Sequence, residues 1–294
     1  MSAAKVNDTA MLRARAETAS AALPPLVLAR GPISAVVAPG GHGLRRPGTG
    51  EDFWQYRPAH GGDTAATIDW RRSARGDSQF VRDRERQTAR TAAIWVGRGA
   101  GMGYRGQTGK GESKFERARL VALSLALSMI RGGERVALLG EAAGAGARQA
   151  EKISFAFGTA GLLSADSDYP DPSAARPGQI VVLIDDFLRS DTRLDAFLQR
   201  AADIGTTGVL LQVMHPDEEG FPFSGAVRFE TVGGNRHETR DADGLRRAYL
   251  ARLAMRREAL SEIAARSGMV FGTHDLDQPL SEALIWLHGV LAAR

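Results

Sequence analysis

The sequence of 294 residues contains no cysteine and very little lysine, and these two shortages set the first limits on its function. Without cysteine the chain has no disulfide, no thiolate metal site and no cysteine nucleophile, which fits a reducing compartment. The lysines are Lys5, Lys110, Lys114 and Lys152, so the remaining basic side chains, out of 38, are arginines. Arginine suits bidentate pairing with carboxylates or phosphates, but we favour a GC-rich coding bias as the cause.

Long hydrophobic runs are also missing. No window reaches about 18 consecutive apolar residues, so we expect no membrane-spanning helix. The N-terminal stretch carries Asp8 and Glu17 and has no compact apolar core, so we expect no secretory signal. The apolar content of 43% is typical of a globular protein, and the formal net charge is a modest +4. We therefore expect a cytoplasmic globular protein.

Strand and helix patterns alternate from residue 92 onward. A capping box, Ser113 with Glu116, precedes a long apolar helix that reaches Ile130. Because helical patterns separate apolar runs, we predict an α/β fold with a doubly wound, mostly parallel sheet. The runs predicted as strands are 92–97, 135–139, 179–184, 207–214, a short one at 226–230, and 269–271. We divide the chain into an N-terminal helical or extended segment (1–37), a basic and aromatic segment or small β-subdomain (38–90), and the α/β domain (91–294).

The end of the first strand is where open α/β sheets bind ligands, and here it is followed by a glycine-rich loop, 97–103. That loop contains no carboxylate and no hydroxyl group. Asp185 and Asp186 end a buried strand at the same edge, and such a pair can bind a hard cation such as Mg²⁺ through oxygen. Because the neighbouring loop has no side-chain oxygen, we favour a structural use of both. No nucleophile–base pair is visible in the sequence, so we do not expect an enzyme.

Residues 45–90 mix charge with aromatic side chains. They hold ten arginines and seven carboxylates, and this near balance favours internal ion pairs over a nucleic-acid surface. We expect Asp63 and Asp69 to pair with Arg57, Arg71 or Arg75. Trp70 is predicted to be a buried anchor of this segment, with the charged side chains around it.

Two segments resemble the family known as domain of unknown function 58. The stretch GEDFWQYRPAHGGDTAATIDWRRSAR (50–75) is similar to its signature, and VVLIDDF (181–187) resembles a family strand that ends in Ser-Asp-Phe, with Asp185 in place of Ser. The matching signature residues are Phe53, Gly62, Asp63, Ile68, Asp69, Trp70, Ala74 and Arg75. The resemblance implies a von Willebrand factor A-like fold, in which a metal-ion-dependent adhesion motif, D-x-S-x-S, follows the first strand.

Gly97, Gly99 and Gly101 stand at the oxygen-bearing positions of that motif. The resemblance therefore does not carry metal binding to this chain, and Asp186 would be the remnant of the site. Family members are commonly encoded beside MoxR-type AAA+ ATPases, and many are thought to assist the assembly or maturation of other proteins. The resemblance thus implies a protein partner, with an AAA+ ATPase as the candidate.

These observations together predict a non-enzymatic protein-interaction module with a degenerate metal-ion-dependent adhesion site and no cofactor. The alternative is a von Willebrand factor A-like domain that binds a divalent cation, with Mg²⁺ as the candidate, through Asp185 and Asp186. We expect neither membrane insertion nor nucleic-acid binding. The residues expected to contact a partner or to form a structural network are Asp63, Asp69, Trp70, Arg71, Arg75 and Arg98.

Overall fold

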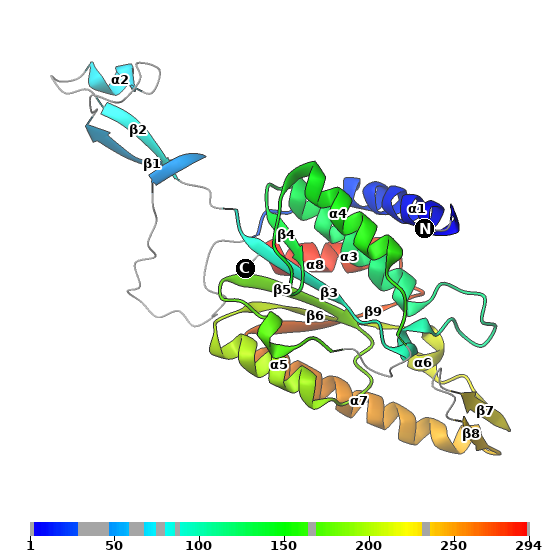
Figure 1. Ribbon diagram of the computed structural model, residues 1–294. Helices are drawn as coiled ribbons and strands as arrows, with labels where there is room; N and C mark the ends of the chain where they lie inside the picture. The colour runs from blue at the N-terminus through cyan, green and yellow to red at the C-terminus, as the bar shows by residue number, and fades with distance from the viewer. Residues whose placement is uncertain are drawn as a thin grey trace. The chain divides into compact units, whose positions relative to one another are not determined.

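The computed structural model describes residues 3–28, 47–58, 68–74, 80–85, 89–163, 169–230 and 236–292. The chain divides into two compact units, one formed by residues 1–34 with 90–294 and one formed by residues 35–89. Helix α1 (Ala3–Ala21) packs on two helices of the α/β unit, so the N-terminal segment belongs to that unit (Figure 1). No helix among the described residues is long and apolar enough to cross a membrane.

A five-stranded parallel sheet forms the centre of the larger unit, in the order β4-β3-β5-β6-β9. Every residue of β5 is buried, and the strand is an apolar, β-branched run, as a sheet covered on both faces requires. The sheet confirms the predicted doubly wound α/β fold. Its strands are β3 (Thr91–Val96), β4 (Arg135–Leu138), β5 (Gln179–Asp185), β6 (Thr207–Met214) and β9 (Met269–Asp275).

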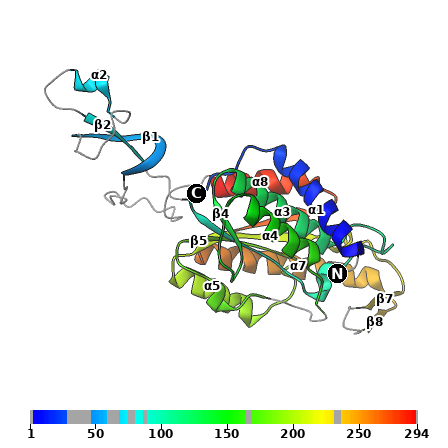
Figure 2. The same cartoon turned by 45° about the horizontal axis from the view of Figure 1, so that its top comes forward.

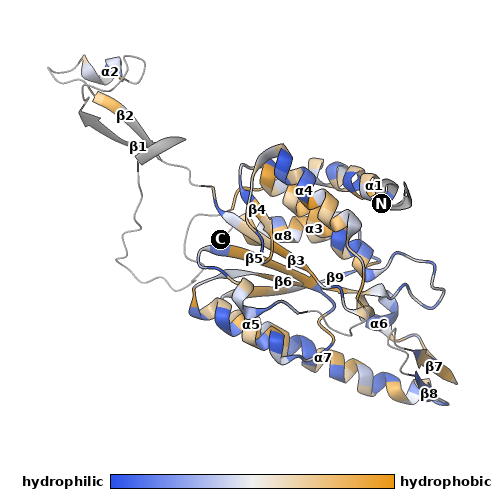
Figure 3. Cartoon of the chain, viewed as in Figure 1, coloured by the Kyte–Doolittle hydropathy of each residue, from blue (hydrophilic) through white to orange (hydrophobic). Residues whose placement is uncertain are grey.

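Helices cover both faces of this sheet (Figures 1 and 2). Successive residues of β3 point to opposite faces, so Ile94 contributes to the core under one helix layer and Ala93 to the core under the other. Figure 3 shows the central strands as the most hydrophobic part of the unit. One layer consists of α3 (Lys114–Arg131), α4 (Gly146–Thr159) and α8 (Leu280–Ala292), with α1 on α3 and α4; the other consists of α5 (Thr192–Asp203) and α7 (Ala242–Arg266).

The strand order creates a crevice at one edge of the sheet. From β3 the chain crosses to β4 on one side and then returns to β5 on the other, so the loops after β3 and β5 diverge at the carboxyl edge. Ligands of doubly wound sheets bind at such a switch point. The short elements at this edge are the 3₁₀ helix η2 (Ala100–Gly103), helix α6 (Pro216–Gly220) and the hairpin of β7 (Val227–Glu230) and β8 (Arg236–Thr239).

The smaller unit contains an antiparallel pair, β1 (Pro47–Pro58) with β2 (Phe80–Glu85), and a single helical turn, α2 (Trp70–Ser73). The hydroxyl of Ser73 donates to the Asp69 carbonyl and accepts from the Phe80 amide, which ties α2 to β2. The prediction of a buried Trp70 is wrong, because 56% of this residue is exposed. It is Ser73, at the end of the turn, that is buried against β2, whereas Trp70 at its start faces solvent.

Candidate functional site

A buried ion-pair cluster lies at the switch point. Lys114 is the first residue of α3, and its fully buried ammonium donates to Asp186 Oδ2 at 2.8 Å and to Glu218 Oε1 at 2.6 Å. Asp186 follows β5, and Glu218 lies in α6 after β6. The predicted capping box, in which Ser113 and Glu116 cap each other, fixes the start of α3 and is confirmed. We call Lys114, Asp186 and Glu218 the Lys114 cluster.

Burial and charge determine the protonation of this cluster. Burial acts most strongly on Lys114 and disfavours its charged form, but Asp186 and Glu218 together outweigh it and raise its pKa. Burial raises the pKa of Glu218, which Lys114 partly offsets. A cation in the first turn of a helix is opposed by the helix dipole, so Lys114 needs these carboxylates. Lys114 is therefore a protonated cation held permanently between two acidic side chains.

Asp185 lies buried beside the cluster, directly before Asp186. Burial, reinforced by the charge of Asp186, raises its pKa well above the usual value. Asp185 Oδ2 accepts from the Phe187 amide at 3.3 Å, and Asp186 Oδ1 accepts from the Leu188 amide at 3.2 Å. The two predicted cation ligands are thus bonded within the protein, and among the described residues no three His, Cys, Asp or Glu side chains gather as a metal site.

The glycine loop leaves the space that these carboxylates fill. A Cβ atom at Gly97 would overlap Asp185 Oδ1, and one at Gly101 would lie 3.0 Å from Asp186 Oδ2. A side chain at Gly97 would collide with Asp185 in its present position, and one at Gly101 would make a tight contact with Asp186. The loop therefore has glycines in place of oxygen-bearing side chains at the positions where Asp185 and Asp186 occupy the space.

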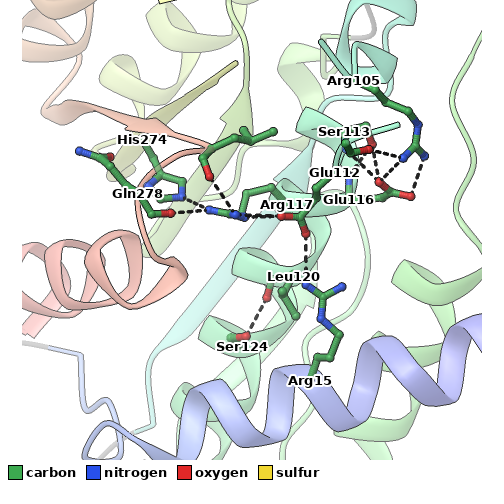
Figure 4. Close-up of polar contacts among 12 residues, drawn as sticks. Arg15, Arg105, Glu112, Ser113, Glu116, Arg117, Leu120, Ser124, His274 and Gln278 are labelled. Atoms are coloured by element: carbon green, nitrogen blue, oxygen red, sulfur yellow. Dashed lines mark hydrogen bonds and ion pairs between the residues drawn. The ribbon is translucent and has the colours of Figure 1, made fainter. Parts of the chain in front are cut away.

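A second polar network fixes the start of α3 to its surroundings (Figure 4). Arg105 makes a bidentate pair with Glu116, with N–O distances of 2.8 and 2.7 Å. Arg117 lies 2.9 Å from His274 Nε2 and donates to two carbonyls beyond β9. Burial, with the nearby charge of Arg117, lowers the pKa of His274 to about 4. His274 is thus a neutral structural contact between β9 and α3.

An apolar groove of about 710 Å³ opens next to the Lys114 cluster. Tyr104 and Glu218 line this groove and also line the neighbouring pocket that contains Lys114 and Asp186. The floor of the groove is an aromatic group in which Phe221 lies 4.8 Å from Tyr249 and 5.0 Å from Phe223, measured between ring centroids. Residues of α7 form one wall, and the hairpin β7–β8 contributes Phe229 and His237. We call this feature the α7 groove.

The remaining predicted site residues lie elsewhere. Arg98 Nε donates to the Gly161 carbonyl at 2.7 Å, so Arg98 anchors the glycine loop to the segment after α4. Arg71 is exposed on α2, and the amide of Asp69 donates to the Phe80 carbonyl, both within the smaller unit. Asp63 and Arg75 lie outside the described residues.

Sequence reasoning missed Lys114, Glu218 and the α7 groove. A usable signal for Lys114 existed, because lysine is rare in this chain and unfavourable in the first turn of a helix. Such a placement indicates that acidic groups from elsewhere in the fold face the ammonium.

Three comparisons with known proteins bear on identity. A comparison with curated proteins found no match. One solved structure, described as an aerotolerance-related membrane protein from Bacteroides fragilis NCTC 9343 with multiple mutations to serines, shares 15% identity and covers 69% of this chain and 100% of its own, with a TM-score of 0.37. Residues 55–154 match the family described as protein of unknown function DUF58, a range that includes the Ile68-Asp69-Trp70 signature, β3 and α3. Over this range, the chain is similar to the DUF58 family, which supports the resemblance that its sequence motifs indicate.

Proposed function

We propose that this protein is a non-enzymatic protein-interaction module whose partner-binding face is the carboxyl edge of the sheet, and that the ammonium of Lys114 acts there as a built-in cation. The observation that carries the proposal is the full burial of Lys114 between Asp186 and Glu218 at the switch point. A divalent cation at this edge would need six or more oxygen ligands. The two carboxylates instead face a cation that cannot dissociate, so partner binding is independent of Mg²⁺.

The chemistry of the residues at this edge supports a binding role rather than catalysis. Lys114 has a raised pKa, so its amine is not free to act as a nucleophile or a base. His215 accepts from the Asp217 amide through Nδ1 as the cap of α6. His274 is buried against Arg117. Lys114, His215 and His274 are therefore each engaged in contacts that hold the fold together.

The resemblance to a family commonly encoded beside MoxR-type AAA+ ATPases supports the finer part of the proposal, in which the partner is such an ATPase. In this role the protein links the ATPase to other proteins during their assembly or maturation. Binding is tested with the full chain and the purified MoxR-type ATPase of the same organism by biolayer interferometry, in the presence of Mg²⁺ and of a chelator. We expect equal affinity in both buffers when nucleotide is omitted.

The cation hypothesis is tested by calorimetric titration of Mg²⁺ and Mn²⁺ into the wild type and four variants. The wild type is expected to show no saturable binding. In Lys114→Ala, Asp186 and Glu218 face the space that the lysine side chain occupied, and we expect this variant to bind Mn²⁺. The double variant Lys114→Ala/Asp186→Asn is expected to lose this binding. Lys152→Ala is the matched control, because Lys152 pairs with Glu141 at 2.7 Å on the surface. Saturable Mg²⁺ binding by the wild type that Asp186→Ala abolishes would contradict the proposal and favour the divalent-cation alternative.

A further inference from the structure

The α7 groove has the dimensions and spacing of a seat for a helix. Besides Tyr249, Ala251, Leu253 and Arg256, the residues of α7 that line the groove and its continuation are five that recur at alternating intervals of three and four, which is the spacing of a helix–helix seam. They are Leu245, Ala248, Arg252, Met255 and Ala259. From the first to the last of these residues the stripe is about 21 Å long, which corresponds to roughly four helical turns.

Apart from Arg252, this stripe is apolar, and all five of its residues are exposed. Met255 is 70% exposed and Leu245 is 37% exposed, while the aromatic side chains beside them pack on one another. The small side chains of Ala248 and Ala259 lie on either side of Arg252 and Met255 along the stripe and allow a second helix to approach closely. Large apolar side chains of a partner helix can therefore fill the space between Met255 and the aromatic floor.

The charge around the groove is positive. Between Ala242 and Arg257 helix α7 carries five arginines and one carboxylate, Asp243. Arg246, Arg247 and Arg252 are exposed, and in the part of the chain that the structure describes none of them forms an ion pair. The two acidic residues that line the groove have partners within the protein, because Asp217 accepts a hydrogen bond from Tyr104 and Glu218 forms an ion pair with Lys114.

We propose that the α7 groove binds an acidic amphipathic helix of a partner protein. This inference rests on the proposed function and identifies the surface and the chemistry through which the module recognises its partner. Acidic side chains on both flanks of the partner helix pair with Arg246, Arg247 and Arg252, and its apolar stripe covers Leu245 and Met255. A second copy of this chain is a poor occupant, because two basic α7 helices would repel each other.

The test uses a displayed library of helical peptides of about four turns, selected on the full-length protein. The enriched peptides are expected to be net acidic, with apolar residues at intervals of three and four. Fluorescence anisotropy then measures their affinities. Met255→Glu and Arg252→Glu are each expected to weaken binding by about tenfold or more, and added salt is expected to weaken it further.

Two variants serve as matched controls. Ile285→Glu places the same charge at an apolar residue that is 57% exposed on α8, and Arg148→Glu reverses an exposed arginine on α4. Both are expected to change the affinity less than about twofold, and circular dichroism confirms that all variants are folded. Enrichment of basic or extended peptides, or of peptides insensitive to Met255→Glu and Arg252→Glu, would overturn the inference.

Other occupants give different results in parallel measurements. Sedimentation with phosphatidylglycerol vesicles that Met255→Glu abolishes would assign the groove to a membrane surface, and a wild-type dimer that Met255→Glu dissociates would assign it to a second copy. Each result would overturn the inference. If the protein binds its ATPase and Met255→Glu has no effect, the proposed function stands and the groove assignment fails. If acidic peptides bind the groove and the wild type binds Mg²⁺ through Asp186, the groove assignment stands. In that case the proposal that Lys114 acts as a built-in cation is wrong.

Discussion

Replacing Lys114 by methionine tests the energetic basis of the Lys114 cluster, because the substitution keeps most of the side-chain length and removes the charge. The side chains of Asp186 and Glu218 are only 12% and 18% exposed, so water cannot fully solvate them after the ammonium is lost. Removing one partner of a buried ion pair costs about 3–5 kcal/mol of unfolding free energy. A domain of this kind is stable by about 5–15 kcal/mol, so the variant remains folded but is clearly weakened.

The physical cause predicts both a pH dependence and a rescue. Without Lys114 the pKa of Glu218 rises further, because its carboxylate loses the cation that partly offsets its burial. Protonation then removes the unpaired charge, so the deficit of Lys114→Met shrinks as the pH is lowered toward about 5. Neutralising the carboxylates in Lys114→Met/Asp186→Asn/Glu218→Gln is expected to restore at least half of the lost stability at neutral pH.

Urea unfolding followed by circular dichroism measures these differences. Lys152→Met is the matched control, because it breaks the exposed pair with Glu141 and is expected to cost less than about 1 kcal/mol. If Lys114→Met costs no more than Lys152→Met, or if its deficit is independent of pH, the buried carboxylates do not depend on the ammonium and the reasoning is refuted.

Three further predictions follow from single contacts. The pKa of His274 is lowered from 6.5 to about 4, so its contribution to the free energy of unfolding is complete above 6.5 and is lost as the pH falls through 4; the loss is roughly 3 kcal/mol. A pH series of urea unfolding should show this loss in the wild type and not in His274→Gln. The same dependence of the free energy of unfolding on pH in both proteins would contradict the prediction. Gly97→Ala forces a Cβ onto Asp185 Oδ1 and is expected to cost about 1–3 kcal/mol in the same assay, whereas Gly161→Ala, which meets no atom within 4 Å, should be near neutral. Trp70→Ala should change the stability by no more than about 0.5 kcal/mol because Trp70 is exposed, and a larger loss would reinstate the buried anchor.

Local patterns were enough to predict most of the larger unit. Strand 207–214 coincides with β6, and the apolar run from 179 ends one residue before β5 does. The capping box of Ser113 and Glu116 marks the start of α3 because its two hydrogen bonds join residues only three positions apart. Parallel strands that are buried on both faces and helices with side-chain caps depend mainly on neighbouring residues, so their sequence signals survive folding.

The candidate site was predictable only in part, because its contacts span the chain. Lys114 meets Asp186 across 72 positions and Glu218 across 104, and no local pattern marks either pair. Asp185 and Asp186 were identified because they end a strand at the switch point, where topology alone indicates a site. For Trp70 the local pattern predicts too much, because an aromatic residue among charged ones resembles a buried anchor. Helix α2 is a single turn and buries only one of its faces, and Trp70 lies on the other.

Helix α7 joins the Lys114 cluster to the α7 groove. Phe187 and Phe221 have positive φ angles of 47° and 44°, a strained conformation for residues with a large side chain. Such residues persist only where several contacts fix them, and α7 makes a contact with each: Arg256 donates to the Phe187 carbonyl at 2.8 Å, and the ring of Tyr249 packs on that of Phe221. Phe187 directly follows Asp186, and Phe221 ends the helix that carries Glu218. Helix α7 therefore contacts both of the strained turns that hold the carboxylates around Lys114.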